Sequence, residues 1–181
     1  MPPPLRYVRA VRPHWIVCLA LAASCRRQPS PPELSSEPPP GTSAPAAPPA
    51  VQGPAVVLHT RGGQRVPVTV EVARTDAQRM RGLMFRREMA ESAGMIFLFP
   101  GESHQTFWMR NTLIPLDMIF IKADRTILGI YRNAVPETDD PRDVPGDSQY
   151  VLEVNGGFCQ RHNVNAGDRA EFVDIPAAPM E

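Results

Sequence analysis

The chain has 181 residues, a formal net charge of zero and 22 prolines that concentrate in its first third. This length suits one domain of ordinary size, and scattered arginines on a neutral chain give no basic surface, which excludes nucleic acid as an expected partner. The only cysteines are at positions 18, 25 and 159, and the first two fall in an apolar N-terminal segment, so an internal disulfide framework is excluded.

Residues 1–24 have the layout of a signal peptide. Arg6, Arg9 and Arg12 precede an apolar, uncharged run from Trp15 to Ala23, and no acidic residue lies before that run. A stable transmembrane helix needs roughly 20 apolar residues, and this run is much shorter. We therefore expect the chain to be exported and the segment to be removed.

Small residues directly precede Cys25, in the sequence Leu21-Ala22-Ala23-Ser24-Cys25. This pattern resembles the lipobox of bacterial lipoproteins, although that family most often has Leu where this chain has Ala22. The resemblance implies that Cys25 becomes an acylated N-terminus and attaches the chain to a membrane. Arg26 stands where an Asp would resemble an inner-membrane retention signal, which favours the outer membrane, facing the periplasm. The alternative is an ordinary secreted protein that is cleaved nearby.

Residues 25–54 are predicted to be a lipidated cysteine followed by a linker. From Arg26 to Pro54 the chain consists mostly of Pro, Ser, Ala, Glu and Gly, and it has too few large apolar residues to build a core. Adjacent prolines at 31–32, 38–40 and 48–49 favour extended, polyproline-like geometry. The segment therefore predicts a disordered but semi-rigid tether between an anchor and a folded domain.

Residues 55–175 carry the patterns of a mostly β domain, and residues 176–181 are expected to be a disordered tail. Strands are predicted at 55–59, 66–73, 94–99, 107–111, 116–121, 126–134, 150–155 and 169–173. Gly62-Gly63 suits a hairpin turn, Pro100-Gly101 is expected to end a central strand, and 135–147 reads as a long acidic loop. We expect a compact antiparallel β-barrel or sandwich-like (α+β) domain with one or two short helices.

A short helix is predicted to follow the second strand. Thr75 and Gln78 have the spacing of a capping box, and Gly82 is expected to weaken the helix soon after it begins. Arg79 leaves this helix near its centre. A second short helix or turn is expected around Cys159.

The densest mixture of apolar and polar residues lies in 107–121, FWMRNTLIPLDMIFI. In a strand, Asp117 shares a face with Ile119, so its carboxylate is expected to be at least partly buried. Glu153 repeats this pattern beside Val151. Because a buried carboxylate needs partners, these two acids are predicted to belong either to a site or to structural ion pairs.

An ordered set of motifs runs through the second half of the chain: Arg79 with Gly82-Leu83-Met84 and Arg86, Gly94-Met95-Ile96-Phe97, Phe107-Trp108-Met109-Arg110-Asn111-Thr112, Pro115-Leu116-Asp117 with Phe120, Val151-Leu152-Glu153 with Gly157, and Gly167-Asp168. This set resembles DUF192 (UPF0127), a prokaryotic family of uncharacterised proteins. The resemblance covers about residues 66–173 and implies a compact, mostly β domain, often behind a signal peptide or anchor, with no established activity. Gln78 stands where the family usually has an acid, which removes one local partner of Arg79.

The candidate ligand-binding residues combine an aromatic ring with polar groups near the middle of the domain: Arg79, Trp108, Asn111, Thr112, Asp117 and Glu153. Such a set suits a small polar or carbohydrate ligand, and it favours a binding or accessory module of the cell envelope over an enzyme. The competing interpretation is that Asp117 and Glu153 pair with Arg79 or Arg110, or cap backbone groups, only to hold the fold together.

Two other functions stay open. One is an envelope hydrolase that uses Asp117 and Glu153 as acid and base, as glycosidases do at separations of roughly 5 to 9.5 Å. The other is a periplasmic Cu(I)-binding protein, because thioethers select Cu(I). Its candidate ligands are Met84, Met95, Met109 and Met118, beside Trp108 and His104.

No cofactor or metal is assigned from the sequence. The histidines at 14, 59, 104 and 162 are too scattered for a zinc-site spacing. Cys159 and His162 are three residues apart, but a catalytic pair also needs spatial geometry and an oxyanion hole. A buried, inert Cys159 is the expectation.

Overall fold

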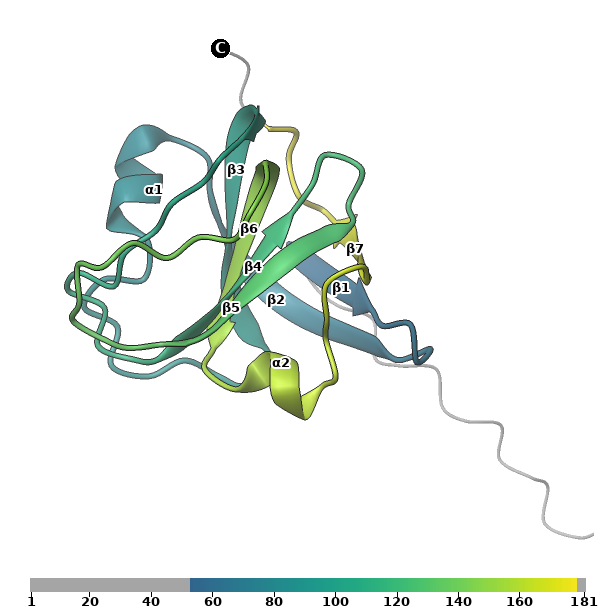
Figure 1. Ribbon diagram of the computed structural model, residues 1–181, viewed down its shortest axis with the longest axis horizontal. Helices are drawn as coiled ribbons and strands as arrows, with labels where there is room; N and C mark the ends of the chain where they lie inside the picture. Colours follow the sequence, from purple (N-terminus) through teal and green to yellow (C-terminus); the bar gives the residue numbers. More distant parts are fainter. Residues whose placement is uncertain (1–52, 179–181) are drawn as a thin grey trace, which may run out of the picture. The chain divides into compact units, whose positions relative to one another are not determined.

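In residues 53–178, which the computed structural model describes, seven strands and two short helices follow one another along the chain. They are β1 (Ala55–His59), β2 (Arg65–Ala73), α1 (Asp76–Arg81), β3 (Ala93–Ser103), β4 (Leu116–Ile121), β5 (Ile127–Ala134), β6 (Ser148–Asn155), α2 (Phe158–Arg161) and β7 (Arg169–Val173). The strands form one sheet in the order β5-β4-β6-β3-β2-β1-β7, which curls into a half-barrel (Figure 1). The predicted mostly β fold with two short helices is confirmed.

One pair of strands differs from the antiparallel expectation. β2 and β3 run parallel, with Val72 opposite Ile96, and the other pairs of this sheet are antiparallel. Parallel neighbours need a crossover connection, and the segment that contains α1 supplies it. This helix begins at the predicted capping box, in which the Gln78 N–H donates to the Thr75 hydroxyl and the Thr75 N–H donates to the Gln78 side chain.

The sheet is covered on both sides, as β4 shows, because all six of its residues are buried. Ile119 points into one apolar cluster, whereas Met118 and Phe120 point into the other. We call the two sides the Ile119 face and the Phe120 face. The predicted alternation along β4 is confirmed. Asp117 therefore lies on the Ile119 face. Glu153 of β6 lies directly opposite Met118 of β4, and so it is on the Phe120 face.

β3 is longer than predicted, since it continues through Pro100 to Ser103. Its register with β6 shifts between Leu98 and Ser103. Proline has no N–H to donate to a sheet, and this irregular stretch places Pro100 where the ladder is interrupted. The end of β3 is exposed, and it borders the cleft described below.

Residues 107–112 do not form the predicted extended strand. Phe107 makes an isolated antiparallel bridge to Arg142, and the Met109 N–H donates to the Thr138 carbonyl at 2.9 Å. These bonds attach the segment to the long acidic loop instead of to a strand of the sheet. The loop at 135–147 is thereby fixed at this end.

The side chains of residues 107–110 nevertheless alternate between the protein interior and solvent. Met109 is fully buried, whereas its neighbours Trp108 and Arg110 are exposed. Asn111 then adopts a φ of 55°, in the left-handed region, and this residue type tolerates that conformation better than most. The chain turns there, which ends the extended geometry before β4.

The predictions for the N-terminal third lie outside the described residues. These are the signal peptide at 1–24, lipidation at Cys25 and the linker as far as residue 52; residues 179–181 of the predicted tail are also outside. Within 53–178, no helix is both long and apolar enough to cross a membrane.

Candidate functional site

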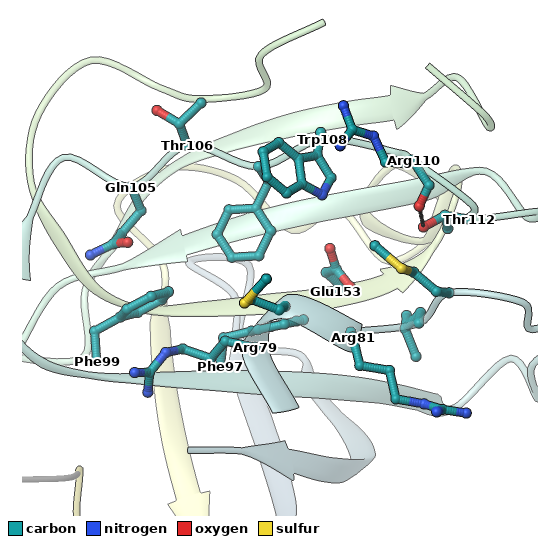
Figure 2. Close-up of a pocket in the computed structure, with 15 residues that line it drawn as sticks. Arg79, Arg81, Phe97, Phe99, Gln105, Thr106, Trp108, Arg110, Thr112 and Glu153 are labelled. Carbon is teal, nitrogen blue, oxygen red and sulfur yellow. Dashed lines mark hydrogen bonds between the residues drawn. The ribbon is translucent and has the colours of Figure 1, made fainter. Parts of the chain in front are cut away.

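A cleft of about 190 Å³ opens on the Phe120 face, between α1, the end of β3 and residues 105–112 (Figure 2). We call it the Glu153 cleft. Four of the six predicted site residues line it, namely Arg79, Trp108, Thr112 and Glu153. Its apolar walls come from the rings of Phe97, Phe99, Phe107 and Trp108 and from Met80 and Met84. The cleft therefore combines apolar walls with polar side chains, which are Arg79, Arg81, Gln105, Thr106, Arg110, Thr112 and Glu153.

Glu153 supplies the acid of the cleft, from the middle of β6. Its neighbours across the sheet are Met95 in β3 and Met118 in β4, and only 4% of the residue is exposed. Burial raises the pKa of the carboxyl to about 8, and no hydrogen bond or ion pair from residues 53–178 opposes that shift. Glu153 is therefore mostly protonated at neutral pH. Figure 2 shows it inside the cleft, below Trp108.

Phe107 forms a rigid part of the cleft wall. Its ring centroid lies 5.0 Å from that of Phe97 and 6.3 Å from that of Phe99, with interplanar angles of 88° and 85°. Edge-to-face pairs of this kind are favourable beyond their buried area. A third such contact, to Phe120 at 6.1 Å, connects the ring to the core. The aromatic wall is thus fixed before any ligand arrives.

Trp108 forms the outer edge of the cleft and is 48% exposed. The Arg110 guanidinium lies 5.0 Å from its ring centroid and donates two hydrogen bonds to the Asp139 carboxylate, at 2.9 and 3.0 Å. Hydrogen bonding to Arg110 lowers the pKa of Asp139. The charge of Arg110 is therefore compensated at the rim, and Trp108 is positioned while its ring stays accessible.

Arg79 has a structural task as well as a place in the lining. Its guanidinium donates to the carbonyls of Arg74 and Leu98, at 2.7 and 2.8 Å, and pairs with Asp76. It also lies 5.2 Å from the centroid of the Phe99 ring. Arg79 thus fastens α1 to β3 and forms one side of the cleft. Neither Arg79 nor Arg110 pairs with Glu153 or Asp117, so the ion-pair part of the competing interpretation is wrong.

Thr112 and Asn111 lie at the same end of the cleft. Thr112 is buried, lines the cleft and donates its hydroxyl to the Arg110 carbonyl at 3.4 Å. Asn111 is exposed and outside the lining, and its amide donates to the Met84 sulfur at 3.9 Å. Because Met84 does line the cleft, Asn111 acts on the wall through that side chain.

Asp117 lies on the opposite side of the sheet, away from the cleft, and is fully buried. One oxygen accepts from the N–H groups of Asn133 and Gly157 at 2.8 and 3.1 Å, and the other accepts from the Cys159 N–H at 2.9 Å. Its partners are backbone amides, which confirms for Asp117 the predicted capping of backbone groups, and it ties β4 to β5 and α2. Burial and the adjacent Asp117 raise the pKa of the Cys159 thiol, which leaves it protonated and inert.

The residues proposed for a hydrolase do not meet. Asp117 and Glu153 belong to adjacent strands but project from opposite faces of the sheet. An acid and a base must flank the same bond of the substrate, and these two groups are separated by the sheet itself.

The residues proposed for Cu(I) also do not converge. Met95, Met109 and Met118 are buried in the apolar cluster of the Phe120 face, and of the four candidates only Met84 lines the cleft. His104 bonds instead to the Gly146 carbonyl and Asp143 at the acidic loop. Across the described part of the chain, no group of three His, Cys, Asp or Glu side chains is arranged to hold a metal ion.

Several walls of the cleft were missed from the sequence, in particular Phe99, Phe107 and Met80. A signal existed for Phe107, because the alternation in 107–111 places it inward together with Met109. Met80 gave a weaker signal, because it is a large apolar residue on a short polar helix. In the structure Met80 is 69% exposed. Phe99 follows Phe97 by two positions in β3, so strand alternation places both rings on the Phe120 face.

These features define a class of small, mostly β domains in which a curled mixed sheet carries an apolar cleft beside a β-α-β crossover. The chain belongs to the DUF192 family (Uncharacterized ACR, COG1430), whose profile matches residues 57–172. The predicted family is confirmed. No functionally curated protein matches the chain.

Two solved structures are similar to this chain. A "putative transcription regulator" from Sinorhizobium meliloti 1021 is 43% identical, with a TM-score of 0.65 over 67% of this chain and 95% of that one. A protein of unknown function from Novosphingobium aromaticivorans DSM 12444 is 42% identical, with a TM-score of 0.63 over 72% of this chain and 94% of that one. Both support the fold and leave the activity of the family open.

Proposed function

We propose that this chain is an exported, lipid-anchored protein of the cell envelope whose folded domain binds a small ligand in the Glu153 cleft. The carboxyl of Glu153 is the observation that carries the binding part, since it is buried beside an open cleft and no group in residues 53–178 pairs with it. An unpaired buried acid costs folding free energy. A ligand that satisfies this acid accounts for its position in the cleft.

The size and lining of the cleft favour binding of a small molecule over catalysis. At about 190 Å³ it is smaller than the pockets of roughly 300 Å³ and more that hold drug-sized ligands. Its rings suit the apolar part of a ligand, and Glu153 and Thr112 suit a polar group. No His, Cys or Lys is among the described residues that line it, so Glu153 has no second acid or base beside it.

A ligand screen by NMR tests this binding. We expect small molecules that bind the wild type to shift the indole N–H signal of Trp108, and Glu153→Leu to lose that response. Unfolding does not explain such a loss, because an apolar residue of similar volume is expected to be at least as stable at this position. Glu171→Gln, which alters an exposed acid in β7, is the matched control. Ligands that bind Glu153→Leu as tightly as the wild type would rule the cleft assignment out.

The envelope part of the proposal is supported by the sequence of residues 1–54. A basic start, a short apolar run, small residues before Cys25 and a Pro-rich tether occur in the order expected of a lipoprotein. Two or more acyl chains hold a protein firmly on a membrane, and Arg26 favours the outer membrane.

Metabolic labelling with a fatty acid tests the anchor. We expect the wild type to carry the label and to fractionate with the outer membrane, and Cys25→Ala to lose the label and accumulate unprocessed. Cys18→Ala, which changes the other N-terminal cysteine, should keep the label. A soluble, unlabelled mature wild type contradicts the anchor and leaves the cleft proposal untouched.

A further inference from the structure

We infer that the ligand of the Glu153 cleft is a small amine whose ammonium group takes Glu153 as its counter-ion. This inference rests on the proposed function, because it names the chemical class of the ligand that the same cleft binds. The molecule expected is a cationic nitrogen attached to a short apolar body.

The Glu153 carboxyl receives no hydrogen bond from the described residues. An ionised carboxylate can only accept hydrogen bonds. Within residues 53–178 no donor reaches the Glu153 carboxylate, although only 4% of the residue is exposed. An ammonium group brings three N–H donors and one positive charge. A buried charge is tolerated when it is both paired and hydrogen-bonded, and the ammonium group supplies both conditions. A neutral amide or hydroxyl supplies only the hydrogen bonds.

The aromatic walls of the cleft suit a cation that is attached to an apolar body. Aromatic faces attract cations, and the cleft already shows this with the protein's own groups. The guanidinium of Arg79 lies 5.2 Å from the Phe99 centroid, and that of Arg110 lies 5.0 Å from the Trp108 centroid. The rings of Phe97 and Phe107 line the same space. An alkyl chain beside the nitrogen finds apolar surface there, so the cleft fits both ends of a small amine.

The strands beside Glu153 place neutral side chains next to its carboxyl. From β3 and β4, the residues opposite it are Met95 and Met118, which are neutral. From α1, Arg79 contributes a positive charge, but Asp76 compensates it. The sheet side of the cleft therefore offers no charge that competes for the acid.

Two further arginines, Arg81 and Arg110, belong to the lining of the cleft. Arg110 is paired with Asp139 through two hydrogen bonds. The guanidinium of Arg81 is directed away from Glu153 in Figure 2. Thr112, from the same segment as Arg110, is neutral. Glu153 is thus the one acid among the described lining residues, and an ammonium group is the complement of that charge.

An ion pair between Glu153 and an ammonium group makes binding depend on pH. Ion pairing requires Glu153 to release its proton to solvent, and in the free protein its pKa is raised to about 8. Below that pH, binding of a permanently charged amine should strengthen about tenfold per pH unit, and the gain should level off above it. No His or Cys is among the described residues that line the cleft, so Glu153 is the group to which this dependence is assigned.

Titration calorimetry of the purified full chain tests the ligand class with three matched probes: n-pentylamine, pentanamide and pentanoate. The amine remains protonated throughout the range used, since alkylamines titrate near pH 10. We expect n-pentylamine to bind about tenfold more tightly at pH 7 than at pH 6, with release of a proton to the buffer. Pentanamide should bind at least about tenfold more weakly than the amine at pH 8, and pentanoate should not bind.

Two variants separate the charge from the shape. Glu153→Gln keeps the size of the side chain and removes its charge, so we expect the amine to lose its advantage over pentanamide together with its pH dependence. Glu171→Gln should bind as the wild type does. A melting curve of each variant confirms that it is folded before titration.

The outcomes distinguish this inference from the proposal beneath it. If pentanamide or pentanoate binds in the cleft as tightly as the amine, the ammonium assignment is overturned while a small-ligand site stands. If the amine binds equally at pH 6 and 8, or equally to Glu153→Gln, Glu153 is not its counter-ion and the inference fails. If none of the three probes binds, the inference also fails, and the NMR screen with Glu153→Leu then decides the cleft proposal separately.

Discussion

Asp117 and Glu153 are buried carboxyl groups on neighbouring strands, and the two faces of the sheet surround them differently. On the Ile119 face, three backbone N–H groups bond to Asp117 at 2.8 to 3.1 Å. On the Phe120 face, no donor from residues 53–178 reaches Glu153, and burial raises its pKa to about 8. Asp117 is therefore satisfied within the fold, whereas Glu153 has no hydrogen-bond donor among the described residues.

The difference shows how a structural acid is distinguished from a candidate site. Burial and an apolar strand are common to both residues. What separates them is whether the protein satisfies the carboxyl, because a satisfied buried acid stabilises the fold and an unsatisfied one destabilises it. Opposite effects of mutation on stability are therefore the test of this comparison.

The largest effect is expected for Asp117→Ala. It leaves the N–H groups of Asn133, Gly157 and Cys159 without their acceptor, and each orphaned buried donor is costly. We expect a loss of about 3 to 5 kcal/mol in the free energy of unfolding, measured by urea denaturation. A melting temperature unchanged from the wild type would show that Asp117 is not structural.

The partners of Asp117 are checked by a double-mutant cycle. Because they are backbone amides, Asp117→Ala combined with Arg79→Ala should be additive, and the same holds for its combination with Arg110→Ala. A clear coupling energy in either cycle would restore the ion-pair interpretation.

The second prediction concerns the pH dependence that Glu153 imposes. Its pKa rises from 4.5 to about 8 on folding, so the unfolded chain releases this proton first. Below pH 4.5 Glu153 is protonated in both the folded and the unfolded chain, so its burial carries no charge penalty. As pH rises from 4.5 towards 8, the free energy of unfolding falls. Between pH 5 and 7 the wild type should lose on the order of 2 to 3 kcal/mol relative to Glu153→Gln, in denaturation series at matched ionic strength. Parallel curves for the two proteins would place the carboxyl in a solvated environment.

The third prediction is a gain in stability. Glu153→Met replaces the unpaired acid with the residue type that already stands opposite it in β3 and β4. We expect the variant to be more stable than the wild type by about 1 to 3 kcal/mol at pH 7, and to show none of the binding described above. A destabilised Glu153→Met would mean that the carboxyl has a structural partner after all.

The smallest effect is expected at the rim. Arg110 and Asp139 form an exposed ion pair, and such pairs contribute little to stability. Arg110→Ala should leave the denaturation midpoint unchanged while weakening ligand binding, because Trp108 loses the group that positions it. Asp147→Ala, at an exposed acid of the same loop, is the control and should alter neither property.

Much of the fold could be predicted from local sequence. The alternation along β4, the capping box of Thr75 and Gln78, and the breaks at Gly62-Gly63 and Gly82 are set by neighbouring residues, and these features agree with the structure. The parallel pairing of β2 with β3 could not be foreseen, since it depends on which strands meet. That choice is made by packing of the whole sheet and not by either strand alone.

The site was only half predictable for the same reason. Sequence patterns identify a carboxyl that is buried, but its partners lie elsewhere in the chain. The donors to Asp117 come from residues 16, 40 and 42 positions away. The isolation of Glu153 depends on Met95 and Met118, which arrive from two other strands. Two acids with the same local pattern thus acquired different tasks through tertiary contacts.

The pairing of β1 with β7 sets Ala55 opposite Val173, so the first and last strands of the domain begin and end side by side. A domain with adjacent ends can be grafted into a surface loop of a host protein with short connectors. It can also be circularly permuted by joining those ends and opening the exposed turn at Gly62-Gly63. The same geometry allows a segment to be attached before Ala55 or after Val173 without changing the pairing of the strands.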